Sequence, residues 1–209
     1  MTESATGIIL RTRPLTETSL IVHWLTPELG RIATVAKGAR RPKSSFRGKL
    51  DLFYEADFSF QRSRRSELHA LREVSLRDTH PALRTELGYV QQASYAAALI
   101  EQTTETDTPI PAIHALLHSF LAALPQHPPQ PRNLYALELK LLEELGQRPN
   151  LDKTALTPGA KTLVNELIAQ DWQAIAELKA TAAQAKELRQ FLHGFLIFHL
   201  GKIPAGRVL

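Results

Sequence analysis

The 209-residue sequence contains no cysteine and only one methionine. The absence of cysteine excludes disulfide bonds, thiolate metal ligands, cysteine nucleophiles and CxxC redox motifs. Nothing in the composition indicates an oxidising compartment, so we expect a cytoplasmic protein. The remaining composition, with 44% hydrophobic and 22% charged residues, is ordinary for a globular protein and allows one or two domains.

The sequence also lacks a long hydrophobic run. The longest stretch without Asp, Glu, Lys or Arg spans residues 108–131, but it contains six prolines and three histidines. A membrane-spanning helix needs about 20 mostly apolar residues, which this stretch does not provide. The first ten residues include Glu3, no Lys or Arg, and only the short apolar run Ile8–Leu10. We therefore predict neither a membrane span nor a secretory signal.

Acidic residues are absent from positions 31–49, whereas basic residues are frequent there. The basic residues of this segment are Arg31, Lys37, Arg40, Arg41, Lys43, Arg47 and Lys49. Residues 1–80 contain 14 Lys and Arg against 9 Asp and Glu, and residues 81–209 contain 11 against 12. The net charge of +4 thus originates in the first part of the chain, which predicts a polyanionic partner for that part.

The hydrophobic periodicity changes at about residue 78. Before it, apolar residues alternate with polar ones, which predicts antiparallel strands over residues 7–13, 19–25, 31–37, 52–60 and 67–74. After it, a period of 3.6 and helix-capping residues predict helices over residues 79–103, 108–124, 132–145 and 157–169, and a last one beginning at Thr181. We predict an α+β protein of two domains, with a five-stranded OB-fold barrel in residues 1–78 and an all-helical domain in residues 79–209. An SH3-like barrel would show nearly the same alternation.

Motifs of enzyme active sites are missing. The sequence has no GxGxxG after a strand, no GxSxG, no HExxH and no phosphate-binding loop. His114 and His118 are four residues apart and His127 is nearby, but no carboxylate lies at helical spacing from them, which favours a packing role over a metal site. We therefore predict a protein that is not an enzyme and that has no cofactor, catalytic residue or metal ligand.

Several segments resemble one protein family. Val35–Ser44 with Phe46–Gly48 resembles the signature of the bacterial DNA repair and recombination mediators of the RecO family, and Gly7–Arg11, Thr18–Thr26, Pro81–Arg84 and Phe198–Gly201 match further parts of it. The resemblance implies an N-terminal OB-fold followed by a helical domain. Many relatives contain a four-cysteine zinc module after the segment that corresponds to Leu145–Leu151. This chain has no cysteine there, so we expect no zinc and regard it as a member that lacks the module.

Single-stranded DNA is bound by basic grooves together with aromatic rings on which bases stack. On this basis the expected DNA-binding residues are Arg11, Lys37, Arg40, Arg41, Lys43, Phe46 and Arg47. Phe46 is the aromatic residue expected to stack on a base. Trp24 and Tyr54 lie on alternating apolar faces, which favours a place in the barrel core.

The family resemblance further implies a mediator of the RecF pathway. Such a protein binds single-stranded DNA, anneals complementary strands without ATP, docks on the acidic C-terminal tail of single-stranded DNA-binding protein, and helps to load recombinase together with RecR. It would be associated with the nucleoid. Arg132, Tyr135 and Lys140 are the candidates for tail docking, with Arg207 and Lys202 as alternatives. The competing hypothesis is an RNA-binding or ribosome-associated OB-fold module whose helical part is a scaffold.

Overall fold

The structure is a computed structural model that describes residues 2–207. The chain forms two compact units. The barrel unit contains the residues up to 81 and residues 104–118, and the helical unit contains residues 82–103 and the residues from 119 onward. Within residues 2–207, no helix is long and apolar enough to cross a lipid bilayer.

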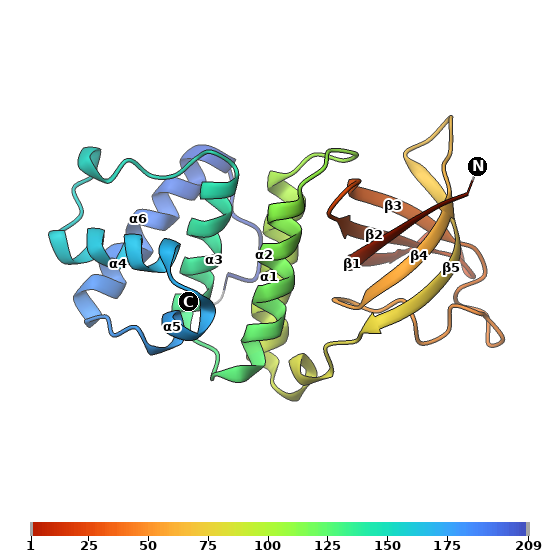
Figure 1. The fold of residues 1–209 in the computed structure, drawn as a ribbon, viewed down its shortest axis with the longest axis horizontal. Coiled ribbons are helices and arrows are strands. Elements are labelled where there is room, and N and C mark those ends of the chain that lie inside the picture. Colours follow the sequence, from red (N-terminus) through yellow and green to blue (C-terminus); the bar gives the residue numbers. More distant parts are fainter. Residues whose placement is uncertain (1, 208–209) are drawn as a thin grey trace. The chain divides into compact units, whose positions relative to one another are not determined.

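The barrel unit is a closed five-stranded barrel in the strand order β1-β2-β3-β5-β4 (Figure 1). Its strands are β1 (Thr2–Pro14), β2 (Leu20–Thr26), β3 (Gly30–Ala36), β4 (Glu55–Gln61) and β5 (Leu68–Asp78). The predicted five-stranded OB-fold barrel is thereby confirmed. The strands joined by short connections pair antiparallel as predicted, namely β1 with β2, β2 with β3, and β4 with β5. β3 and β5, which are not consecutive in sequence, pair in parallel, and this pairing closes the barrel.

The barrel core is centred on aromatic side chains that alternate with outward-facing residues along the strands. The ring of Trp24 on β2 stacks on that of Phe58 on β4, with centroids 4.0 Å apart. The indole Nε1 of Trp24 donates a hydrogen bond of 2.9 Å to Thr34 Oγ1, so its one polar atom is satisfied inside the core. Tyr54 is half-buried and packs against the same cluster.

The helical elements follow the barrel strands in sequence. They are α1 (Leu87–Thr103), α2 (Pro111–Ala123), α3 (Pro131–Glu144), α4 (Pro158–Ala169), α5 (Trp172–Glu177) and α6 (Ala182–Leu200), with short 3₁₀ turns at Pro81–Thr85, Leu124–Gln126 and Leu151–Lys153. The predicted starts at Thr157 and Thr181 are confirmed, because each hydroxyl accepts a hydrogen bond from a backbone amide of the first turn. α2 contributes residues to both compact units.

One buried ion pair lies inside the helical unit. Glu138 on α3 is fully buried, and its carboxylate accepts two hydrogen bonds of 2.6 Å from the guanidinium of Arg207. The hydroxyl of Tyr95 on α1 donates a third bond of 2.7 Å to the same carboxylate. The segment after α6 is therefore joined to the core of this unit by a charged contact.

Candidate nucleic-acid interface

The connection between β3 and β4 is an ordered loop, which we call the basic loop (residues 37–49). Successive backbone hydrogen bonds between residues three apart fold it into turns, among them Arg41 N to Gly38 O at 3.0 Å and Ser44 N to Arg41 O at 3.1 Å. Gly38 has a φ of 71°, a left-handed conformation that favours glycine. The backbone amide of Arg40 also donates to Thr18 O at 3.0 Å, which fastens the loop to the β1–β2 connection.

The structure brings five of the expected DNA-binding residues together on this loop. Their side chains are all exposed to solvent: Lys37, Arg40, Arg41, Lys43 and Arg47. Among residues 2–207, none of these five takes part in an ion pair. Because no carboxylate neutralises them, the loop presents a positive field to solvent that attracts anions.

Phe46 is placed differently from the expectation. Its side chain is 8% exposed and belongs to the barrel core cluster that also contains Trp24 and Phe58. In this structure Phe46 therefore anchors the basic loop in the core and offers little of its ring for base stacking. A loop residue has no hydrophobic periodicity that would reveal such burial from sequence.

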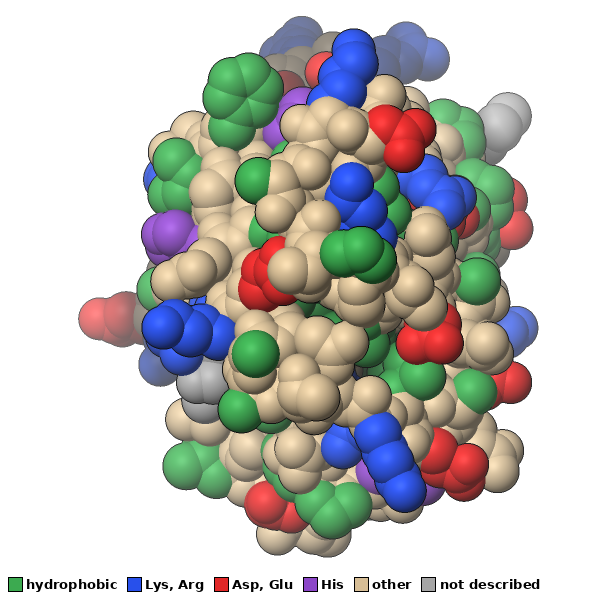
Figure 2. Space-filling view, turned by 90° about the vertical axis from the view of Figure 1, so that its left-hand side faces the viewer, with side chains coloured by type: hydrophobic (Ala, Val, Ile, Leu, Met, Phe, Trp, Pro, Cys, Tyr) green, Lys and Arg blue, Asp and Glu red, His purple; other side chains and the backbone are tan. Residues whose placement is uncertain are grey.

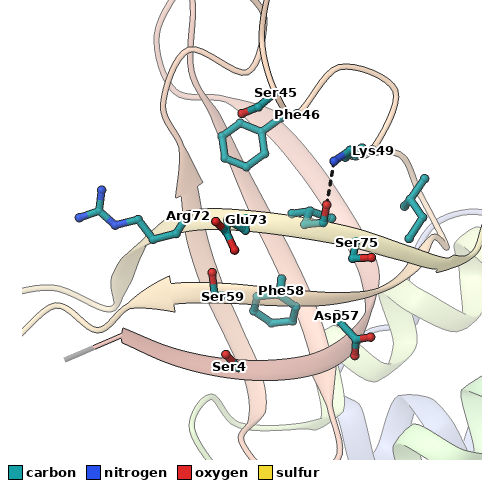
Figure 3. Close-up of a pocket in the computed structure, with 12 residues that line it drawn as sticks. Ser4, Ser45, Phe46, Lys49, Asp57, Phe58, Ser59, Arg72, Glu73 and Ser75 are labelled. Atoms are coloured by element: carbon teal, nitrogen blue, oxygen red, sulfur yellow. Dashed lines mark hydrogen bonds between the residues drawn. The ribbon is translucent and has the colours of Figure 1, made fainter.

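A hollow of about 660 Å³ lies between this loop and strands β1, β4 and β5 (Figure 3). Phe46 and Phe58 form part of its apolar lining, and Lys49 Nζ donates to Val74 O at 2.9 Å at its edge. The charged side chains that line it are Lys49, Arg72, Asp57 and Glu73. The two signs are balanced, so this hollow attracts a polyanion less than the basic loop does.

Arg11 does not belong to the basic loop. It lies on β1 and lines a separate hollow together with Arg13 and Arg31. Neither Arg13 nor Arg31 was among the expected DNA-binding residues. The alternation along β1 and β3 places such residues on the outer face of the barrel, but the sequence alone does not show which strands become neighbours.

A larger hollow of about 980 Å³ lies in the helical unit, between α3, α4, α5 and α6. Two of the expected docking residues line it, because Arg132 and the buried Tyr135 both face it from α3. Its other apolar lining includes Leu163, Leu167 and Leu188. The charged residues around it are Arg132, Lys179, Lys186 and Arg189 against the single acid Glu177. An apolar floor with a basic rim suits a peptide that has an apolar side chain beside a carboxylate.

Lys140, the third expected docking residue, does not line this hollow. Its ammonium donates hydrogen bonds to Ile168 O at 2.6 Å and Gln170 O at 2.7 Å, which satisfies carbonyls at the end of α4. Burial lowers the pKa of Lys140, although Glu143 and Asp171 oppose the shift. The ammonium group of Lys140 therefore stabilises the end of α4 and does not face the proposed ligand.

Of the other candidate cations, Arg132 and Arg207 have side-chain contacts within the helical unit, whereas the contact given for Lys202 is made by its backbone. Arg132 donates to the carbonyl of Leu178 at the end of α5. Arg207 is engaged by Glu138, and the backbone carbonyl of Lys202 accepts a hydrogen bond of 2.6 Å from Gln102 Nε2. The exposed cations Lys186 and Arg189 on α6 are better placed to meet a ligand, and their spacing of three residues on one helix was the sequence signal for them.

Figure 2 views one face of the molecule on which Lys and Arg side chains stand apart, with acidic and hydrophobic side chains between them. No continuous field of one sign covers this face. The positive charge of the chain is more concentrated on the basic loop, which is the main electrostatic feature for a polyanion.

The histidines that are four residues apart belong to the barrel unit, in which His114 is half-buried and His118 is exposed. The rings of His114 and His118 are nearly parallel with centroids 6.5 Å apart, and His118 Nδ1 lies 3.0 Å from Glu55 Oε2. Burial lowers the pKa of His114. In the part of the chain that the structure describes, no group of three or more His, Asp or Glu side chains is arranged to hold a metal ion.

Comparisons with known proteins agree on one family. The model of the N-terminal part of recombination protein O matches residues 1–80, and the model of its C-terminal part matches residues 85–157. Relatives named DNA repair protein RecO include one from Anaeromyxobacter dehalogenans strain 2CP-C, which is 35% identical over 150 residues, covering 72% of this chain and 59% of the relative.

Two further relatives have the same name. The protein from Symbiobacterium thermophilum is 34% identical over 69% of this chain and 57% of its own length. The protein from Exiguobacterium sibiricum is 29% identical over 73% of this chain and 60% of its own length. The chain thus spans less than two thirds of the length of these curated relatives. Both family models nevertheless match in the expected order along most of the sequence, and the chain belongs to the RecO family.

Proposed function

We propose that this chain acts in DNA repair and recombination as a mediator that binds single-stranded DNA. The observation that carries the proposal is the basic loop, on which five exposed cations lack an acidic partner among residues 2–207. The names of the relatives, DNA repair protein RecO, support the same role. The barrel is of a type that often binds oligonucleotides.

Binding through the basic loop depends on salt, because each neutralised phosphate releases a counterion. For single strands the slope of log K against log salt is about −0.7 per phosphate contact. Five cations that each meet one phosphate predict a slope of about −3.5. The contacts are to phosphates, so no sequence specificity is expected.

Annealing follows from the same chemistry. Neutralising phosphates on two complementary strands reduces their repulsion, and base pairing then supplies the free energy. Neither a nucleotide nor a catalytic residue is required. We therefore include ATP-independent annealing in the proposed function, and loading of recombinase together with RecR as the step it serves.

The hollow of the helical unit is the proposed docking site for the C-terminal tail of single-stranded DNA-binding protein. Tyr135, Leu163 and Leu188 offer an apolar floor. Lys186 and Arg189 at the rim suit the carboxylates of an acidic tail. Arg132 lines the hollow but already donates to the carbonyl of Leu178, so we propose that it shapes the hollow and does not bind the carboxylates of the tail.

The test is annealing of two complementary oligonucleotides coated with single-stranded DNA-binding protein, without ATP and over a series of salt concentrations. Intact coat protein is compared with a form that lacks its acidic tail. We expect acceleration that depends on the tail and declines with salt. Absence of acceleration on both coats would refute the proposal and favour an RNA-binding module.

Two variants separate the two sites. Arg40→Glu with Arg41→Glu should abolish annealing of bare strands, because two attractive contacts become repulsive. Lys186→Glu with Arg189→Glu should preserve annealing of bare strands and remove only the effect of the tail. The opposite pattern would exchange the assigned roles, and circular dichroism verifies that each variant is folded.

A further inference from the structure

A second cationic hollow of about 370 Å³ lies on the outer face of the barrel. The strand registers explain its position. Arg11 on β1 lies opposite His23 on β2, His23 opposite Ala33 on β3, and Ala33 opposite Leu68 on β5. These residues form one row across four neighbouring strands, and the small side chain of Ala33 leaves a depression between His23 and Leu68.

Three arginines surround this depression. Arg11 and Arg13 come from β1 and Arg31 from β3, and all three line the hollow. Arg31 is held in place because its Nε donates to Thr104 Oγ1 at 2.8 Å and its guanidinium also donates to the carbonyl of the same residue. The arginines approach from two strands that flank β2, so their charges face a common space.

His23 reports the electrostatic potential in this space. Burial, as the largest cause, and the positive charges of Arg11, Arg13 and Arg31 together lower the pKa of His23 to about 4. The imidazole is therefore neutral at physiological pH. The site disfavours an added cation and should favour an anion.

Two carboxylates also line the hollow and must be set against the arginines. Asp107 accepts a hydrogen bond of 2.9 Å from Arg62, which also pairs with Glu3. Arg62 is shared between Asp107 and Glu3, so it balances the charge of Asp107 only in part. Glu67 is exposed and, among residues 2–207, no hydrogen bond or ion pair joins it to an arginine. The hollow is thus lined by three arginines against two carboxylates, one of which shares Arg62 with Glu3.

We infer that this hollow is a phosphate site for a nucleic-acid strand, in which Arg11, Arg13 and Arg31 bind one phosphate group. The inference rests on the proposed function and adds a contact away from the basic loop. A hollow of about 370 Å³ is at the small end of ligand pockets, which span about 300–1,000 Å³. The planar guanidinium groups of Arg11 and Arg13 can bind phosphate oxygens in pairs, which a lysine cannot do. Nε and Nη2 of Arg31 already donate to Thr104, so Arg31 contributes mainly its positive charge. The phosphate is either an internal phosphodiester or a terminal phosphomonoester.

The experiment measures binding of the full chain to dT oligonucleotides of about 16 nucleotides, the upper end of what one OB-fold covers. Three forms are compared: hydroxyl at both ends, phosphate at the 5′ end and phosphate at the 3′ end. Affinity is measured between about 50 and 200 mM salt. The variants are Arg13→Gln and Arg11→Gln with Arg13→Gln. Lys153→Gln with Lys161→Gln is the control for loss of two charges, because both residues lie in the helical unit.

Loss of one phosphate contact should make the salt slope shallower by about 0.7, which corresponds to about fivefold weaker binding at 0.1 M salt if the lines meet near 1 M. The control should leave the slope unchanged. An effect on all three oligonucleotides indicates an internal phosphodiester, and an effect only on one end-phosphorylated form indicates a terminal phosphate. Both support the site.

An unchanged slope in the hollow variants, while Arg40→Glu with Arg41→Glu still weakens binding, would overturn this inference and leave the proposed function standing. Failure of the unaltered chain to bind any of the oligonucleotides would overturn both. Arg13 is exposed on a barrel strand, so the single variant is expected to fold. Thermal unfolding of each variant verifies this.

Discussion

Replacing Arg207 with alanine should strongly destabilise the helical unit. The substitution removes both hydrogen bonds from the guanidinium to the Glu138 carboxylate and leaves that carboxylate with the hydroxyl of Tyr95. Glu138 has no exposed surface, so water cannot replace the lost partner without opening the core. The cost is therefore that of a buried charge without its counter-charge.

The magnitude follows from the exposure of the two side chains, 0% for Glu138 and 8% for Arg207. Removing one partner of such a buried pair costs about 3–5 kcal/mol of unfolding free energy. In a chain of this length each kcal/mol lowers Tm by about 2–4 °C, so we expect a decrease of about 6–20 °C. Arg148→Ala is the matched control, because Arg148 pairs with Glu143 at 2.7 Å on the surface and its loss should cost less than about 1 kcal/mol.

The effect should depend on pH in a defined direction. Burial raises the pKa of Glu138 in the folded protein, and Arg207 and Tyr95 oppose the shift. Without Arg207 the folded-state pKa should rise further above the unfolded value. The difference in stability should then be small at about pH 3, where the carboxyl is mostly protonated in both the folded and the unfolded state, and should grow as pH rises through the folded-state pKa.

Thermal unfolding followed by circular dichroism from acidic to neutral pH is the assay. Glu138→Met combined with Arg207→Met should recover most of the loss, because no buried charge then remains. If Arg207→Ala lowers Tm no more than Arg148→Ala at neutral pH, the pair does not stabilise the unit as argued. A loss independent of pH would refute the electrostatic cause.

Three further outcomes are expected in the barrel unit. Arg13→Gln should raise the pKa of His23 from about 4, but NMR titration should still find it below 6.5, because burial is the largest cause of the shift. Glu67→Gln should tighten DNA binding by up to about fivefold at low salt, since removing a like charge about 4 Å from a phosphate saves about 1 kcal/mol in water; weaker binding in a titration would contradict this. Gly30→Ala should lower the unfolding free energy by at least about 1–2 kcal/mol, because φ is +66° and the new Cβ would lie 1.9 Å from Thr108 O. Urea denaturation should show this as a lower midpoint, and an unchanged midpoint would show that the turn relaxes.

The strands and most helices could be predicted because their signals are local. Alternating apolar residues marked each barrel strand, and Thr157 and Thr181 marked two helix starts. α5 (Trp172–Glu177) was missed because six residues are too few to show a helical period. Its N-cap Asp171, which accepts from Ala174 N at 2.8 Å, was the available signal.

The candidate sites could be predicted only where their residues are neighbours in sequence. The five exposed cations of the basic loop lie on one short segment, so composition revealed them. The hollow lined by Arg11, Arg13 and Arg31 depends on which strands are adjacent, and the parallel pairing of β3 with β5 that completes it is set by barrel closure. Phe46 was expected to be accessible for base stacking, but it is buried, because aromatic character alone does not reveal burial in a loop.

The barrel unit is discontinuous in sequence, since residues 104–118 return to it after α1. Thr106 forms a bridge with Arg31, and Asp107 N donates to Arg31 O at 3.0 Å, so this segment covers the start of β3. A gene fragment that stops at residue 80 would encode all five strands but not this cover. The barrel is therefore a poor transferable module: a chimera or an isolated fragment designed at the boundary of the N-terminal family model would expose backbone groups that the whole chain keeps paired.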